Sequence, residues 1–234
     1  MTRPRLWIAL AVLIAALLFL PLRLAAGLIG LDETGLTARQ TSGTIWSGRF
    51  DQARFGGFDL GTLDTGLRPL PLLLGRARFA FERAQGGGPL PLTGSIDIGP
   101  GRRVVDGLSG TVTAVGPQPL PIESVSFDQA SVHFSDGQCR SASGRVQLML
   151  AVRIAGIDLR NGLSGEVRCE GRALLVPLAG QSGMERLNLT IEGDGSYHAR
   201  FGIAATDPVT AAALSAAGFS STSEGWYRTV RGQF

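Results

Sequence analysis

Apolar and polar side chains alternate along most of the chain after residue 40. The clearest run covers residues 146–154, where every second residue is Val, Leu or Ile. A period of two places these side chains on one face of a strand. The same alternation in residues 187–191 and 197–203, on either side of Gly193-Asp194-Gly195, predicts a β-hairpin. We therefore expect a mostly β fold, an antiparallel meander or sandwich-like domain.

Glycine and proline divide this pattern into short segments. Proline cannot donate to an interior ladder, so the three Pro-Leu-Pro sequences predict connections or sheet edges. A four-residue motif also recurs, in which a small or hydroxyl residue is followed by Gly, any residue and a β-branched residue. We expect each copy of this motif to start a strand just after a glycine turn. The Pro-Leu-Pro sequences are residues 69–71, 89–91 and 119–121, and the glycine copies are residues 42–45, 93–96, 109–112, 143–146 and 164–167.

One short helix is predicted near the C-terminus. Asp207 can cap it, Pro208 suits the first helical position, and residues 209–217 are rich in alanine. Gly218 then ends the helix.

The N-terminus carries an unbroken apolar run, Leu6 to Leu20. At about 1.5 Å per residue, such a run nearly crosses a bilayer core, and Arg23 can extend it by reaching the far interface. Arg3 and Arg5 precede the run, with Trp7 as an interfacial aromatic. The positive-inside rule then places the N-terminus in the cytoplasm and the rest of the chain outside.

The predicted organisation is a cytoplasmic N-terminus (1–5), a single transmembrane anchor (6–26) and an exported β-rich domain (27–234). A cleaved signal peptide is the competing interpretation, because its basic and apolar regions look alike. Both interpretations export the bulk of the chain. Residues 84–91 are rich in Gly and Pro, and form a soft boundary between two strand groups of one domain.

Charge excludes one class of partner. The formal net charge is +3, and all 22 basic residues are arginine. The first 23 residues hold three of these arginines and no acid, which leaves 19 basic against 19 acidic residues in the remainder. A nucleic-acid-binding face would need a basic excess there, so we expect no nucleic-acid partner.

The two cysteines, Cys139 and Cys169, both lie in the exported part. An isolated pair in an oxidising compartment predicts a disulfide. Closing a loop of about 30 residues stabilises a fold by roughly 3 kcal/mol.

The usual catalytic and cofactor motifs are absent from the sequence. The two histidines, His133 and His198, alternate with apolar neighbours, as solvated residues of a strand face do. We expect no enzyme activity, no catalytic residue, no metal and no cofactor.

Residues 41–49 read TSGTIWSGR, shortly after the apolar segment. This run resembles a motif of the type II secretion system protein N family. Residues 60–63, 68–70, 75–76, 163–171 and 192–197 resemble later landmarks of that family, which also has an aromatic near Thr65-Gly66 that this chain lacks. The motif residues are Gly43, Thr44, Ile45, Trp46, Ser47, Gly48 and Arg49.

The resemblance implies an inner-membrane, single-pass protein with a β-rich periplasmic domain that contacts other type II secretion subunits. Gly43 and Gly48 bracket what we interpret as a short strand. Trp46 between them is either a core anchor or part of a docking surface, and can bury about 200 Å².

A second function class stays open: a periplasmic lipid-handling protein similar to the AsmA-like or lipopolysaccharide-bridge proteins. These join one anchor to a one-sided sheet that cradles acyl chains. An open apolar trough would favour this lipid ligand, whereas a closed sandwich with Trp46 buried would favour a scaffold.

Overall fold

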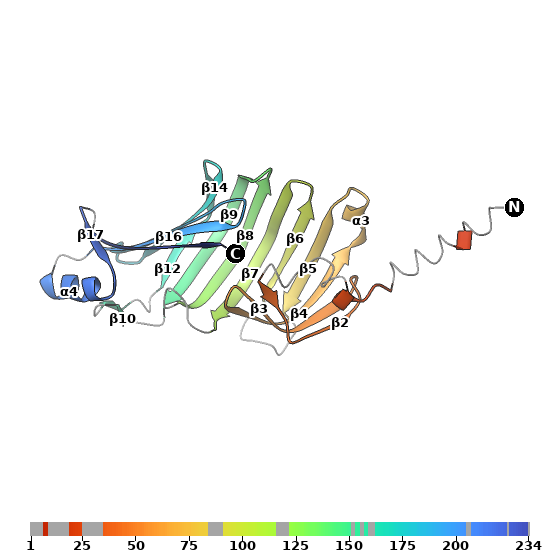
Figure 1. Cartoon of the computed structure of the whole chain (residues 1–234), viewed down its shortest axis with the longest axis horizontal. Coiled ribbons are helices and arrows are strands. Elements are labelled where there is room, and N and C mark those ends of the chain that lie inside the picture. The colour runs from red at the N-terminus through yellow and green to blue at the C-terminus, as the bar shows by residue number, and fades with distance from the viewer. Residues whose placement is uncertain are drawn as a thin grey trace.

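A single long antiparallel sheet dominates the protein (Figure 1). The computed structural model describes residues 7–8, 19–24, 35–83, 91–115, 122–150, 153–154, 157–158, 162–204, 207–223 and 225–233. Sixteen strands join in the order β1-β3-β4-β5-β6-β7-β8-β9-β12-β14-β15-β16-β18-β17, with β2 beside β3 and β13 beside β14. The predicted mostly β fold is confirmed.

The strands before residue 115 form a first strand group, whose bounds differ from the predicted soft boundary at 84–91. Its strands are β1 (Leu36–Thr37), β2 (Gln40–Gly43), β3 (Gly48–Phe55), β4 (Phe58–Arg68), β5 (Ala77–Arg83), β6 (Thr93–Gly99) and β7 (Arg102–Ala114). A helical turn, α3 (Pro69–Leu72), connects β4 to β5, so the Pro-Leu-Pro sequence there is a connection as predicted. The other two copies lie largely outside the described residues.

This first group closes partly on itself. The start of β4 pairs with the end of β7, Phe58 opposite Ala114, while the rest of β4 pairs with β5. Arg83 is buried across this closure, where its Nε donates to the Leu60 carbonyl at 2.9 Å and its Nη2 to the Thr111 carbonyl at 3.0 Å. Burial lowers the pKa of Arg83, and these carbonyl partners compensate for its lost hydration.

The second strand group follows residue 121. Its strands are β8 (Ile122–Ser135), β9 (Gln138–Leu150), β12 (Leu163–Glu166), β13 (Arg168–Glu170), β14 (Ala173–Gly180), β15 (Glu185–Ile191), β16 (Ser196–Ile203), β17 (Ser220–Thr222) and β18 (Gly225–Gln233). A separate pair, β10 (Arg153–Ile154) and β11 (Ile157–Asp158), accompanies them.

The second group folds over to cover its own apolar face. Figure 1 shows β16 and β18 crossing at an angle to β9 and β12. Leu148 and Leu150 of β9 are therefore buried with Leu178, Leu187 and other side chains from β14 to β16. The largest hydrophobic core thus lies between two parts of one continuous sheet.

Two local predictions are confirmed. β15 and β16 form the expected hairpin, with Leu187 opposite Phe201. The predicted helix is α4 (Pro208–Ala216), in which Asp207 Oδ1 accepts a hydrogen bond from the Thr210 amide at 2.8 Å. Gly218 follows it with a φ of 81°.

The prediction for the recurrent glycine motif is wrong for several copies. Gly110 and Gly144 lie inside β7 and β9, not before them, and both have positive φ beside shifts in strand register. A Cβ atom at Gly165 of β12 would overlap the Pro177 carbonyl oxygen. These glycines allow bends and close backbone approaches within the sheet.

The predicted membrane anchor falls mostly outside the described residues, as do Arg3, Arg5 and most of the soft boundary at 84–91. Within the part of the chain that the structure describes, no helix is long and apolar enough to span a bilayer. Trp7 and Arg23 are described, and both side chains are exposed.

Candidate functional site

The motif residues form a tight hairpin turn, not the short strand that we expected. Gly43 pairs with Gly48 across β2 and β3, and the intervening residues make the turn. The Thr44 amide donates to the Ser47 carbonyl at 3.0 Å, and the Ser47 amide lies 3.4 Å from Thr44 Oγ1. Gly43 has a φ of 82°, which suits glycine at this position. We call residues 43–49 the motif hairpin.

The motif hairpin binds the end of the apolar N-terminal segment to the sheet. The Ile45 amide donates to the Leu20 carbonyl at 3.1 Å, and the Leu67 amide donates to the Ile45 carbonyl at 2.9 Å. The side chains of Leu22, Ile45 and Leu67 form a buried cluster. We call this contact between residues 20–22, the motif hairpin and Leu67 the clamp.

Gly48 makes room for the clamp. A Cβ atom there would overlap Leu22 Cδ2 and would lie 2.8 Å from the Thr44 carbonyl oxygen. Only glycine therefore fits without a shift of its neighbours, which gives a physical reason for a Gly at this motif position.

Trp46 lies beside the clamp and is half-buried. It packs partly against the clamp cluster and also lines an open hollow of about 800 Å³ over β3, β4 and β5. A Cβ atom at Gly66 would lie 2.6 Å from the Trp46 carbonyl oxygen. The hairpin thus occupies the space beside Gly66, so a side chain at this position would require a shift of the hairpin backbone.

The hollow has a mixed charged and apolar lining. Arg49 binds Asp64 through two hydrogen bonds, of 2.6 Å from Nε and 3.1 Å from Nη2. The hydrogen bond to Asp64, followed by its charge, raises the pKa of Arg49. Arg68, Phe81 and Glu82 are among the other residues that line the hollow. Such a surface can bind a polypeptide segment through apolar contact and paired charges.

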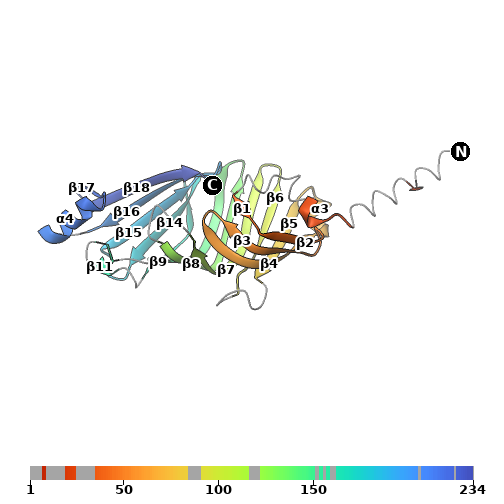
Figure 2. The ribbon, with the colours of Figure 1, turned by 60° about the horizontal axis from the view of Figure 1, so that its bottom comes forward.

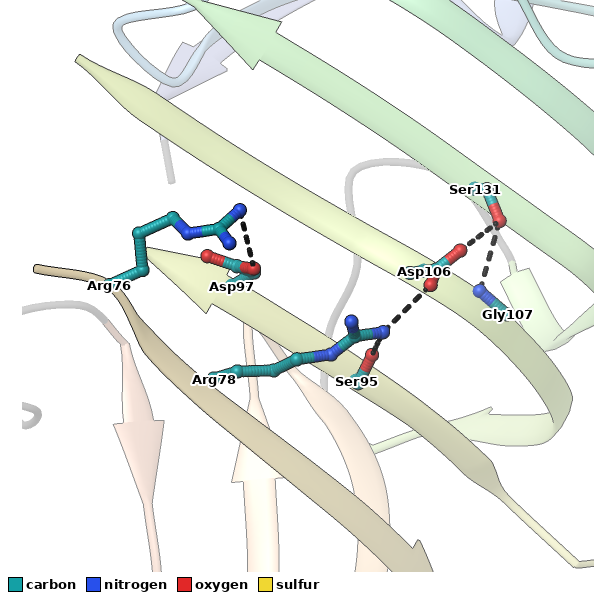
Figure 3. A network of polar contacts seen from close by, with 7 residues as sticks. All are labelled: Arg76, Arg78, Ser95, Asp97, Asp106, Gly107 and Ser131. Carbon is teal, nitrogen blue, oxygen red and sulfur yellow. Dashed lines mark hydrogen bonds and ion pairs between the residues drawn. The ribbon is translucent and has the colours of Figure 1, made fainter. Parts of the chain in front are cut away.

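A polar network links the neighbouring strands β5 to β8 (Figure 3). Arg78 donates to Ser95 at 3.1 Å and to Asp106 at 2.9 Å, and Ser131 donates to the same carboxylate at 3.2 Å. Arg76 lies 3.9 Å from the buried Asp97. The network cross-links strands β5 to β8.

The predicted disulfide and one of the two histidines lie apart from the hollow. The Cys139–Cys169 disulfide is present and joins β9 to β13 in the second strand group. His133 contacts Arg102, with 2.8 Å between Nε2 and Nη1. Among the described residues, no cluster of three or more His, Cys, Asp and Glu side chains could hold a metal ion.

Sequence reasoning missed three contributors to the site: Leu22, Asp64 and Leu67. The paired glycines at 43 and 48 could have signalled a hairpin, since four residues separate them. Nothing in the local sequence indicated that Leu22 would pack on Ile45, because that contact is long-range.

The fold and the motif hairpin define a β-rich protein whose long sheet is attached to an apolar N-terminal segment. A family model described as type II secretion system (T2SS), protein N, matches residues 34–230. The chain therefore belongs to the type II secretion system protein N family, as the resemblance predicted. Comparisons with curated proteins and with solved structures gave no match.

Proposed function

We propose that this chain is a non-catalytic accessory subunit of the type II secretion machinery. Residues 6–26 anchor it in the inner membrane with the N-terminus in the cytoplasm, and its sheet extends into the periplasm. There it supports export of folded proteins across the outer membrane by contacting another subunit. The observation that carries this proposal is the motif hairpin, which lies in the family-matched region and joins the apolar segment to the sheet.

The hollow beside Trp46 is the docking surface in this proposal. Trp46 is half-buried and lines this hollow together with Arg49, and aromatic and Arg side chains are typical anchors of protein interfaces. In this proposal, Trp46 packs against the clamp with one part of its side chain and contacts the partner subunit with the other part.

The lipid-handling alternative finds less support. The apolar face of β9 that would line a groove is buried in a hydrophobic core that also contains side chains of β14 to β16. Leu148 and Leu150 are only 3% and 2% exposed. Because these side chains fill a core, they offer no open trough for acyl chains.

The test uses a strain in which this chain is deleted in frame and then restored as wild type, as Arg49→Gln or as Arg145→Gln. Arg145 is the matched control, since it forms an exposed ion pair with Glu166 in the second strand group. The side chains of the Arg49–Asp64 pair are 51% and 46% exposed, so loss of this ion pair should have little effect on the stability of the fold.

We expect deletion to trap secreted enzymes in the periplasm, with export restored by wild type and by Arg145→Gln. Arg49→Gln should accumulate to the wild-type level and still leave export several-fold lower. Full export with Arg49→Gln would refute docking at the hollow. Normal export after deletion would refute the secretion role, and altered outer-membrane permeability in that strain would favour lipid handling.

A further inference from the structure

The connection between β4 and β5 presents a cluster of leucines to solvent. Residues 69–75 read PLPLLLG and contain no charged side chain. Leu70, Leu73 and Leu74 are 76%, 84% and 70% exposed, and Leu72 is 38% exposed. We call this segment the leucine tip. An exposed apolar cluster of this kind marks a contact surface.

The backbone of the leucine tip satisfies most of its own hydrogen-bond donors. The amides of Leu73, Leu74, Gly75 and Arg76 donate to carbonyls of residues 70–72 at 3.0–3.2 Å. Prolines at 69 and 71 have no amide hydrogen to satisfy. Unpaired backbone groups make insertion into lipid unfavourable. Because most backbone donors of this turn are paired, moving it out of water costs little free energy.

The leucine tip lies at the end of the molecule where the apolar N-terminal segment meets the sheet. Leu67, three residues before Leu70, packs in the clamp with Leu22. Phe19 and Leu24, on either side of Leu22, are also strongly exposed. Figures 1 and 2 show α3 at this end of the sheet and α4 at the opposite end.

Arginines flank the leucine tip on both sides. Arg68 precedes it with an exposed side chain, and Arg76 follows it beside Asp97. Arg23 at the clamp is exposed as well. Apolar side chains bordered by basic residues are typical of segments that lie in the bilayer interface.

We propose that the leucine tip inserts into the headgroup region of the bilayer that holds the N-terminal segment. This second contact rests on the membrane attachment in the proposed function, and it would orient the sheet on the membrane instead of leaving it tethered at one point. A bilayer suits the tip better than a protein partner because the tip has no polar side chain to specify a protein. It also follows Leu67, which packs with Leu22 at the end of the apolar run.

The test uses the full-length chain in liposomes of phosphatidylethanolamine and phosphatidylglycerol. Leu73→Cys carries an environment-sensitive fluorophore, and its matched control is Val209→Cys on α4, where Val209 is 80% exposed. Each variant has one free thiol, since Cys139 and Cys169 form a disulfide. Lipids spin-labelled near the headgroup then quench any fluorophore at the interface, and flotation measures attachment of the whole chain.

We expect both variants to float with the liposomes and the Leu73 fluorophore to be quenched several-fold more than the Val209 fluorophore. Equal quenching of the two in floating protein would overturn the insertion while leaving the anchor in place. Failure of the chain to float would refute the anchor, and the insertion with it. Weak quenching in liposomes combined with cross-linking of Leu73→Cys to a secretion subunit in cells would assign the tip to a protein partner.

Discussion

At the residue scale, single glycines decide how closely two segments approach. The absence of a side chain at Gly48 leaves space for Leu22 and the Thr44 carbonyl, and its absence at Gly66 leaves space for the backbone of Trp46. In both cases a methyl group would meet a backbone oxygen, which moves less readily than a side-chain terminus. Gly48 of the motif hairpin and Gly66 of β4 thus have a packing role.

Gly48→Ala should loosen the clamp. The added methyl group crowds Leu22 and the Thr44 carbonyl oxygen, and overpacking of this kind costs about 1–3 kcal/mol. We expect amide hydrogen exchange at Ile45 and Leu67 to accelerate about tenfold or more, since their hydrogen bonds join the clamp. Ser47→Ala, at an exposed position of the same turn, is the control. Unchanged exchange in Gly48→Ala would contradict this account of the motif.

At the element scale, α4 shows local and tertiary effects acting together. Asp207 accepts the Thr210 amide at the N-terminus, while Leu214 is fully buried against the second strand group. Phe219, just after the helix, contacts Phe201 edge to face with 5.8 Å between ring centroids. The cap determines where the helix begins, and the buried side chains hold it against the sheet.

The cap predicts a pH dependence for α4. Hydrogen bonds from the Thr210 side chain and then its amide lower the pKa of Asp207. A lowered pKa in the folded state means that the stabilisation is present above the unfolded aspartate pKa and is lost as the pH falls through the folded value. Protection of the Thr210 amide should therefore decrease below about pH 4.

Asp207→Asn separates charge from capping, because it keeps an oxygen acceptor that does not titrate. In this variant, protection of Thr210 should not depend on pH across the same range. A wild-type helix whose protection stays constant down to pH 2 would show that the carboxylate charge contributes nothing to the cap.

At the scale of the whole molecule, the disulfide supports a fold in which most contacts are between strands. Cys139 and Cys169 join β9 to β13 across 30 residues. Replacing both by Ala should lower the free energy of unfolding by about 3 kcal/mol. Urea unfolding of the full chain in mild detergent measures this loss. A reductant should lower the urea midpoint of the wild type and leave that of the double-alanine variant unchanged. Identical urea midpoints for the wild type and the variant would contradict a stabilising role of the disulfide.

Local patterns predicted some elements well and others poorly. The β15–β16 hairpin and α4 were predictable because alternation, turn glycines and a cap act over a few residues. The strand interpretation of residues 43–48 was wrong because it took the two glycines as the ends of one strand, whereas they pair with each other across a hairpin turn. The glycines inside β7 and β9 were misplaced because the bends that require them arise from distant segments.

The sequence by itself determined that the protein is mostly β, that it has one capped helix near the C-terminus and that it belongs to its family. Each of these rests on periodicity, capping chemistry or a contiguous motif, which are properties of neighbouring residues. Tertiary structure alone decided that the apolar face of β9 is buried, that Trp46 borders a hollow and that Leu67, two residues before the leucine tip, packs in the clamp. These depend on the bending of one long sheet, and that bending brings together residues far apart in the chain.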